Sequence, residues 1–170
     1  TMGVAVLKAA GMIEGIAGEI ALIDVNRQKA EGEALDLKHG LQFVSTSRIA
    51  FGNDYKLCRG ADVVVVCAGA HQAKGETRLG LIGKNAAIFK QIIPKIAKNS
   101  PNCILLIVAN PVDVLTYLAL KYSRFPKGRV IGSGTLLDTA RLRYGLSQHF
   151  KVSPAHIHAF ILGEHGDTEF

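Results

Sequence analysis

Short runs of β-forming residues alternate along this chain with longer segments of helical periodicity. In such an alternation each helix carries the chain back, so that successive strands lie parallel in a sheet covered on both faces. The strand candidates are EIALIDV at 19–25, RIAFG at 48–52, DVVVVCAG at 62–69, CILLIVA at 103–109, RVIGSG at 129–134 and IHAFILG at 157–163. The helix candidates are 3–14, 26–38, 80–98, 111–123 and 135–149. The pattern predicts an α/β fold with a doubly wound parallel sheet.

Composition favours a soluble globular protein and argues against two classes of partner. Apolar residues make up 48% and charged residues 20% of the 170 positions, and no apolar run reaches the roughly 18 residues that a membrane helix needs. The net charge of +6 is spread along the chain and aromatic content is 6%. We therefore expect neither nucleic acid nor membrane as a partner, and the small cluster of Arg124, Lys127 and Arg129 is expected to be a solvated surface.

The cysteines and the N-terminal stretch indicate a cytoplasmic protein. Cys58, Cys67 and Cys103 form neither a CxxC pair nor an obvious disulfide framework, so we expect reduced thiols, two of them in the core, and no metal site. The stretch TMGVAVLKAAGMIEG lacks a basic leader and is not expected to be a signal peptide.

Polar residues and glycines gather where the predicted strands end: Asp24, Gly69, Asn110 and Ser133 each follow an apolar run. Ligands bind at this edge of an open parallel sheet. Ordinary strand-to-helix turns would explain any one of these residues, but they explain the whole set less well. The edge is therefore the predicted site.

The cofactor pattern is incomplete. Asp24 ends a strand where a Rossmann fold places the carboxylate that binds an adenosine ribose, but the GxGxxG turn is absent. Gly3 would be its last glycine, and the first strand would lie before Thr1. In a Rossmann sheet that strand is central, between 19–25 and 62–69, so its loss leaves backbone groups unpaired. Either the natural protein is longer, or another segment fills the gap.

A histidine near the end of the chain is the candidate catalytic group. His165 lies in GEHGDTEF, and imidazole gains and loses a proton near neutral pH. A lone histidine at a strand end is more often structural. However, GETRLGLIGKN, ANPVDVLTY, GSGTLLDTARLR and GEHGDTE occur here in order, and with them the chain closely resembles the L-lactate and malate dehydrogenase family from about Gly3 to Phe170.

This resemblance implies roles for five side chains. His165 would exchange a proton with the substrate oxygen, and Asp138 would bind its ring. Arg141 would grip the substrate carboxylate through two hydrogen bonds. Arg78 would lie on a mobile loop that closes over the substrate, although alone it reads as a solvent-exposed charge. Asn110 would bind substrate beside the nicotinamide, or merely cap the following helix.

The resemblance also implies specificity. Gln72 occupies the loop position where malate enzymes typically have arginine, so we expect lactate and pyruvate as substrates, with malate dehydrogenase as the alternative. Asp24 favours NAD over NADP, because a carboxylate repels a 2′-phosphate. Tyr55 could instead be a surface ring and Lys29 an exposed helix charge. The implied cofactor-binding residues are Met2, Gly3, Asp24, Lys29, Tyr55, Gly69, Ala70, Gln91, Val108, Ala109, Asn110 and Ser133.

Further implications concern assembly and regulation. Arg143 and His158 match an effector site for fructose 1,6-bisphosphate in bacterial members, which are commonly homotetramers active in glycolysis and pyruvate fermentation. Residues 1–156 would form the clipped dinucleotide-binding domain and 157–170 the start of a truncated substrate domain. We expect this segment alone to lack turnover, because its site could not close. A non-catalytic NAD-binding or assembly module is the other reading.

Overall fold

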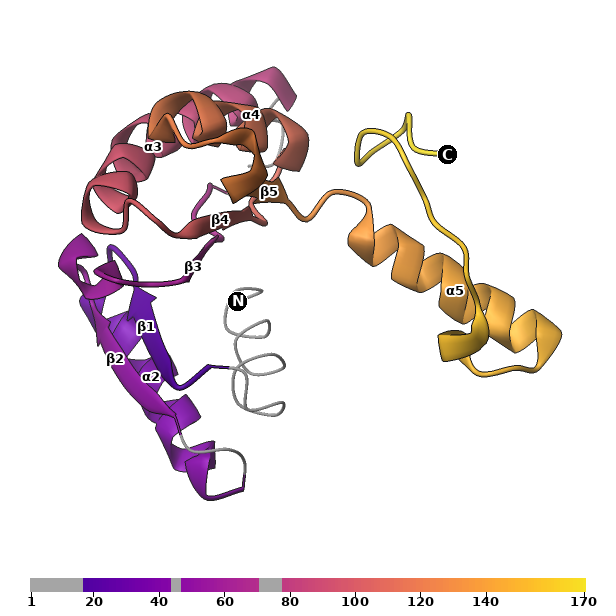
Figure 1. Cartoon of the computed structure of the whole chain (residues 1–170), viewed down its shortest axis with the longest axis horizontal. Helices are drawn as coiled ribbons and strands as arrows, with labels where there is room; N and C mark the ends of the chain where they lie inside the picture. The colour runs from indigo at the N-terminus through magenta and orange to yellow at the C-terminus, as the bar shows by residue number, and fades with distance from the viewer. Residues whose placement is uncertain (1–16, 44–46, 71–77) are drawn as a thin grey trace.

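The computed structural model describes residues 17–43, 47–70 and 78–170. Strands and helices alternate along the chain, as predicted (Figure 1). The strands are β1 (Glu19–Ile23), β2 (Arg48–Gly52), β3 (Val63–Val66), β4 (Ile104–Ile107) and β5 (Val130–Gly132). The α-helices are α2 (Arg27–Gly40), α3 (Arg78–Asn99), α4 (Val112–Ser123) and α5 (Leu136–Phe150), and short 3-10 turns are η2 (Leu41–Phe43), η3 (Tyr55–Cys58), η4 (Lys127–Arg129) and η5 (Pro154–His156). The predicted helix at 3–14 lies outside the described residues.

The described strands form two parallel sheets. Strand β1 pairs with β2 from Glu19↔Arg48 to Ile23↔Gly52, and β3, β4 and β5 form a second sheet in that order. These pairings confirm the α/β class with parallel strands. The sheet is divided between β1 and β3, at the position where the sequence predicted an interruption.

The two sheets have separate cores. The larger core lies between β3–β5 and helices α3 and α4, which pack closely on each other, and it includes the fully buried Phe89, Ile93 and Leu115. The smaller core joins β1 and β2 to α2 and contains Ile20, Leu22, Ala34 and Leu37. Alternate strand residues enter the larger core because side chains along a strand point to opposite faces.

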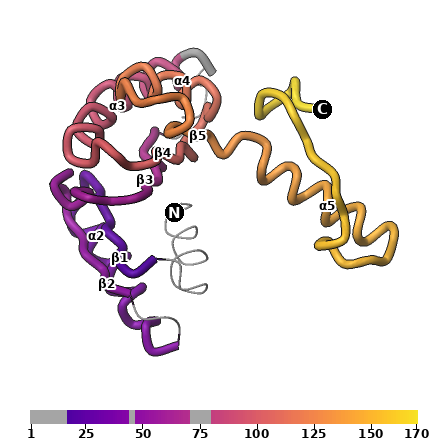
Figure 2. The backbone as a smooth tube through the Cα atoms, in the orientation of Figure 1, coloured from indigo at the N-terminus to yellow at the C-terminus, as the bar shows by residue number. Residues whose placement is uncertain are grey.

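The second face of the three-stranded sheet is partly exposed among the described residues. Val63, Ile104 and Ile131 share that face, and they are 50%, 37% and 46% exposed. Helix α5 does not cover them, because it extends away from the sheet together with the C-terminal segment (Figure 2). Among the described helices, α3 and α4 therefore cover one face only.

The expected strand at 157–163 is wrong. No strand forms there, and much of its backbone bonds to helix α5 and its N-cap. Thr135 Oγ1 donates to the carbonyl of Ile161, the N–H of Ile161 donates to Thr139 Oγ1, and Arg143 Nε donates to the carbonyl of Ala159. Leu162 instead exchanges two backbone hydrogen bonds with Phe170.

The cysteines agree with the prediction of free thiols. Cys58 and Cys103 are buried in the larger core, and Cys67 is half-buried. Burial raises the pKa of the Cys67 and Cys103 thiols, which favours their protonated, unreactive form. Within the described part of the chain, no helix is long and apolar enough to cross a membrane.

Candidate active site

The carboxyl ends of the strands bring together residues of the predicted cofactor site. Gly69 and Ala70 follow β3, Ala109 and Asn110 follow β4, and Ser133 follows β5. The N–H of Ser133 donates to the carbonyl of Ile107 at 2.9 Å, and the N–H groups of Val108 and Ala109 donate to that of Val66. Since β3, β4 and β5 are adjacent and parallel, these residues share one edge.

A buried asparagine holds this edge in place. Asn85 on α3 is completely buried; its Oδ1 accepts from the N–H of Ala70 at 2.7 Å and its Nδ2 donates to the carbonyl of Asn110 at 2.8 Å. One side chain thus connects the ends of β3 and β4. A Cβ placed on Gly69 would lie 3.4 Å from the Asn85 amide, so the backbone at Gly69 runs close to the Asn85 side chain.

The adenosine-side candidates lie at the end of β1. Asp24 Oδ1 accepts from the N–H of Asn26 at 2.9 Å, and Oδ2 lies 3.8 Å from Lys29 Nζ. Tyr55 packs partly buried against the larger core, so it is not a surface ring. Burial, followed by the charges of Cys58 and Asp24, raises the pKa of the Tyr55 hydroxyl, which keeps it protonated as a hydrogen-bond donor.

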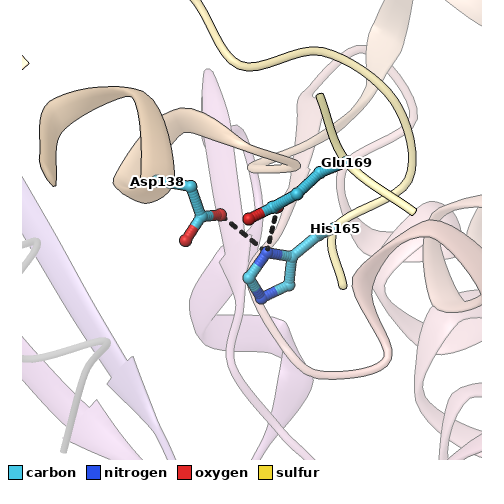
Figure 3. Close-up of side chains that lie close together, drawn as sticks. All are labelled: Asp138, His165 and Glu169. Atoms are coloured by element: carbon cyan, nitrogen blue, oxygen red, sulfur yellow. Dashed lines mark hydrogen bonds and ion pairs between the residues drawn. The ribbon is translucent and has the colours of Figure 1, made fainter. Parts of the chain in front are cut away.

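The strongest catalytic contact joins His165 to Asp138. Its ring Nδ1 lies 2.7 Å from Asp138 Oδ2, and the Asp138 side chain is 9% exposed (Figure 3). A carboxylate in this position accepts a hydrogen bond from Nδ1–H and leaves Nε2 directed elsewhere. The pair therefore has the arrangement of a histidine whose tautomer and orientation are fixed by a carboxylate.

Two further carboxylates approach the same histidine. The backbone N–H of His165 donates to Asp113 Oδ2 at 2.9 Å, and Glu169 Oε2 lies 3.7 Å from His165 Nδ1. Figure 3 shows Asp138 and Glu169 both directed at this ring nitrogen. That Glu169 oxygen is buried and accepts no hydrogen bond.

Arg141 lies on the same helix as Asp138. Its Nη1 is 3.3 Å from Asp138 Oδ1, and 68% of its side chain is exposed. Asp138 is buried but most of the Arg141 side chain is not, so the guanidinium N–H groups that do not face Asp138 remain available to an anionic ligand. The structure thus brings Arg141, Asp138 and His165 into one group.

Of the two predicted effector residues, Arg143 contacts the segment that contains His158. Arg143 Nε donates to the carbonyl of Ala159 at 2.9 Å, and its guanidinium lies 4.5 Å from the centre of the Phe160 ring. His158, the residue before Ala159, is exposed. Arg143 is therefore anchored next to His158.

Other predicted residues lie apart from these groups or outside the described chain. Gln91 is exposed on α3, about 9 Å along the helix beyond Asn85 at 1.5 Å per residue. Helix α4 has no side-chain cap, so the capping role considered for Asn110 is wrong. Arg78 begins α3, but its side chain, like Met2, Gly3 and Gln72, lies outside what the structure describes.

Sequence reasoning missed Asn85, Asp113 and Glu169. Asn85 has a visible signature, because it falls within the apolar stripe of Leu81, Ile88 and Phe89, where a polar residue needs a partner. Asp113 resembles an ordinary acidic residue in the first turn of a helix. The sequence positions of Asp113 and Glu169 do not indicate that either residue contacts the site.

Comparison with known proteins assigns the chain to a family. Residues 2–132 match the lactate/malate dehydrogenase NAD binding domain, and residues 135–170 match the alpha/beta C-terminal domain of the same family. The chain belongs to the lactate/malate dehydrogenase family. The match to its NAD binding domain assigns NAD as the cofactor.

Individual relatives within this family are named L-lactate dehydrogenase. L-lactate dehydrogenase 1 of Clostridium acetobutylicum is 57% identical over 91% of this chain and 49% of its own length. The L-lactate dehydrogenase of Acetivibrio thermocellus is 56% identical over 93% of this chain and 50% of its own. The chain thus spans about half the length of these curated relatives.

A solved family structure has the same fold. The crystal structure of a lactate dehydrogenase from a Medee basin deep-sea metagenome library superposes with a TM-score of 0.91 at 48% identity. The match covers 99% of this chain and 53% of that one. The position of helix α5 and the C-terminal segment is therefore part of a family fold, in which they belong to the second domain.

Proposed function

We propose that this segment forms the NAD-binding half of an L-lactate dehydrogenase that reversibly reduces pyruvate to L-lactate. The observation behind the proposal is the 2.7 Å contact between His165 Nδ1 and Asp138 Oδ2, with Arg141 beside it. A general acid, its orienting carboxylate and a free guanidinium are the groups that reduction of a 2-keto acid requires. The names of the relatives supply the substrate class.

The reaction follows from the placement of these groups. NADH, when bound, supplies the hydride to the carbonyl carbon. His165 in its cationic form gives its Nε2 proton to the carbonyl oxygen, and it takes that proton back in lactate oxidation. Asp138 keeps Nδ1 protonated in both directions and favours the cation. Arg141 binds the substrate carboxylate with guanidinium N–H groups that do not face Asp138, because 68% of its side chain is exposed.

The residues at the strand ends fit NAD. The Asp24 carboxylate is half-exposed at the end of β1 and already oriented by the N–H of Asn26 and by Lys29, as a ribose acceptor should be. Ala70 and Asn110 are exposed on the far side of the fully buried Asn85 clamp. We assign Gly69, Ala70, Val108, Ala109 and Ser133 to the groove, together with Tyr55.

A substrate comparison tests the proposal. In a protein of the relatives' length that contains this segment, kcat/KM with NADH should be higher for pyruvate than for oxaloacetate, because Gln72 offers no charge to a second carboxylate. Faster turnover of oxaloacetate would establish malate dehydrogenase instead. Absence of reduction with either keto acid would leave the NAD-binding or assembly module as the function.

Regulation and assembly extend the proposal. We infer that Arg143 and His158 bind a sugar bisphosphate, because Arg143 is anchored to Ala159, the residue after the exposed His158, and both side chains can donate to phosphate oxygens. The assembly is a cytoplasmic homotetramer in which paired subunits complete that site. Fructose 1,6-bisphosphate should lower the KM for pyruvate, and Arg143→Gln should remove this response.

A further inference from the structure

The backbone of the residue that would transfer the proton is tied to a second helix. The N–H of His165 donates to Asp113 Oδ2 at 2.9 Å, across 52 positions of sequence. Asp113 lies in the first turn of α4, and Asp138, which binds the His165 ring, lies in the first turn of α5. Because α4 and α5 follow the adjacent parallel strands β4 and β5, both carboxylates come from the same edge of the sheet.

The segment around His165 depends on such an anchor. Gly163 has φ 102 and Gly166 has φ 148, so glycines in left-handed conformations stand on both sides of the histidine. Glycine permits many backbone conformations, and fixing one of them costs conformational entropy. A carboxylate acceptor at the N–H of His165 selects the conformation in which the ring reaches Asp138.

Asp113 also connects two parts of the molecule. The chain leading to His165 is otherwise bonded to α5 and its N-cap: Thr135 and Thr139 bond to Ile161, and Arg143 bonds to Ala159, while Asp138 contacts the His165 ring. Helix α4 belongs to the larger core, and it follows directly after Asn110, the proposed neighbour of the nicotinamide. The bond from Asp113 therefore sets the distance between the proton donor and the strand ends that would hold the cofactor.

We propose that Asp113 is a positioning residue for His165. Its carboxylate holds the His165 backbone at a fixed position relative to the strand ends that are proposed to bind the cofactor, while Asp138 fixes the His165 ring. The inference rests on the proposed function. Asp113 acts through His165 and not through direct contact with the substrate. Its loss should lower the rate of proton and hydride transfer while leaving NADH binding intact.

A pair of substitutions tests the bond in a protein of the relatives' length containing this segment. Asp113→Ala removes the acceptor, whereas Asp113→Asn keeps an oxygen at the same place without the charge. We expect kcat for pyruvate reduction to fall about tenfold in the alanine variant and to stay within about threefold of the parent in the asparagine variant, as for one hydrogen bond. Asp62→Ala, an exposed carboxylate at the opposite edge of the sheet, is the matched control.

Two readouts separate positioning from general stability. The kinetic isotope effect with NADH deuterated at the transferred position should rise in Asp113→Ala, because chemistry becomes slower than product release. The NMR resonance of the His165 Nδ1 proton should broaden or shift in Asp113→Ala and persist in Asp113→Asn. Both measurements should be unchanged in Asp62→Ala.

The contrary outcomes are equally definite. Parent-like kcat and an unchanged His165 resonance in Asp113→Ala would overturn the inference. Equal losses in the alanine and asparagine variants, or a loss confined to NADH affinity or melting temperature, would also overturn it. If the parent reduces no keto acid, the proposed function fails, and the NMR comparison still decides whether Asp113 positions His165.

Discussion

Asn85 donates its side-chain amide to the carbonyl oxygen of Asn110 at 2.8 Å while accepting from the N–H of Ala70. This single contact pattern joins the ends of two adjacent strands. It lies at the edge where the cofactor is proposed to bind, so the shape of that edge depends on a motif residue to which the resemblance gave no role.

Replacing this asparagine should weaken both stability and cofactor binding. Asn85→Ala removes two hydrogen bonds, each with a net contribution of about 0.5–1.5 kcal/mol. We expect the free energy of unfolding to fall by about 1–3 kcal/mol and the Kd for NADH to rise, as measured by urea denaturation and fluorescence titration. Asn99→Ala, which removes an exposed bond at the end of the same helix, should change either quantity little. Equal effects of the two substitutions would contradict the proposed role of Asn85 in joining the two strand ends.

Asp138→Asn should impair catalysis without preventing NADH binding. The amide is of the same size but can present its N–H₂ group to His165 Nδ1, which favours the wrong tautomer and removes the charge that stabilises the cation. We expect kcat for pyruvate reduction to fall by at least about a hundredfold, with the Kd for NADH within about twofold of the parent. Stopped-flow kinetics and titration would measure them. A parent-like kcat would exclude the assigned role.

Gln72→Arg should change the preferred substrate. Arginine would pair with the second carboxylate of oxaloacetate and would be left unpaired beside the methyl group of pyruvate. We expect kcat/KM to rise for oxaloacetate and to fall for pyruvate, each by tenfold or more for one ion pair in a closed site. Gln91→Arg, on the exposed side of α3, is the matched control and should leave the ratio unchanged. An unchanged ratio in Gln72→Arg would show that this position does not face the substrate.

Two glycines should respond oppositely to alanine. A Cβ at Gly132 on β5 would lie 2.5 Å from Thr116 Oγ1, which already donates to the carbonyl of Val112. We expect Gly132→Ala to lower the free energy of unfolding by about 1–3 kcal/mol through overpacking. Gly83 lies exposed in α3 with nothing within 4 Å of a built Cβ, so Gly83→Ala should raise it by up to about 1 kcal/mol. Shifts of the denaturation midpoint in the same direction for both variants would refute this packing argument.

The order of elements could be predicted because it depends on local periodicity. Each of the five described strands falls within a predicted apolar run, and the interruption between β1 and β3 followed from an unmatched strand position. The segment 157–163 was assigned incorrectly because its partner is a helix. An apolar run does not reveal whether a strand or the side chains of Thr135 and Thr139 will satisfy its backbone.

The site was predictable where a motif encodes the contact. His165 and Asp138 meet at 2.7 Å, as the resemblance implied, although they are 27 residues apart. Asn85 and Asp113 also lie within the motifs GETRLGLIGKN and ANPVDVLTY, but the resemblance implied no role for them, and their contacts are with residues 25 and 52 positions away. Such contacts depend on how two helices start at one sheet edge, which no local pattern describes.

The division of the sheet has a consequence for how the molecule fluctuates. Strand β4 is paired on both sides and belongs to the larger core, whereas β1 and β2 share a core of four buried residues with α2. Amide hydrogen exchange should therefore be slowest in β4 and faster in β1 and β2. The adenosine end of the proposed cofactor site, at Asp24, then belongs to the part that opens more easily. Protection of β1 and β2 on adding NAD would report binding there directly, before any turnover is measured.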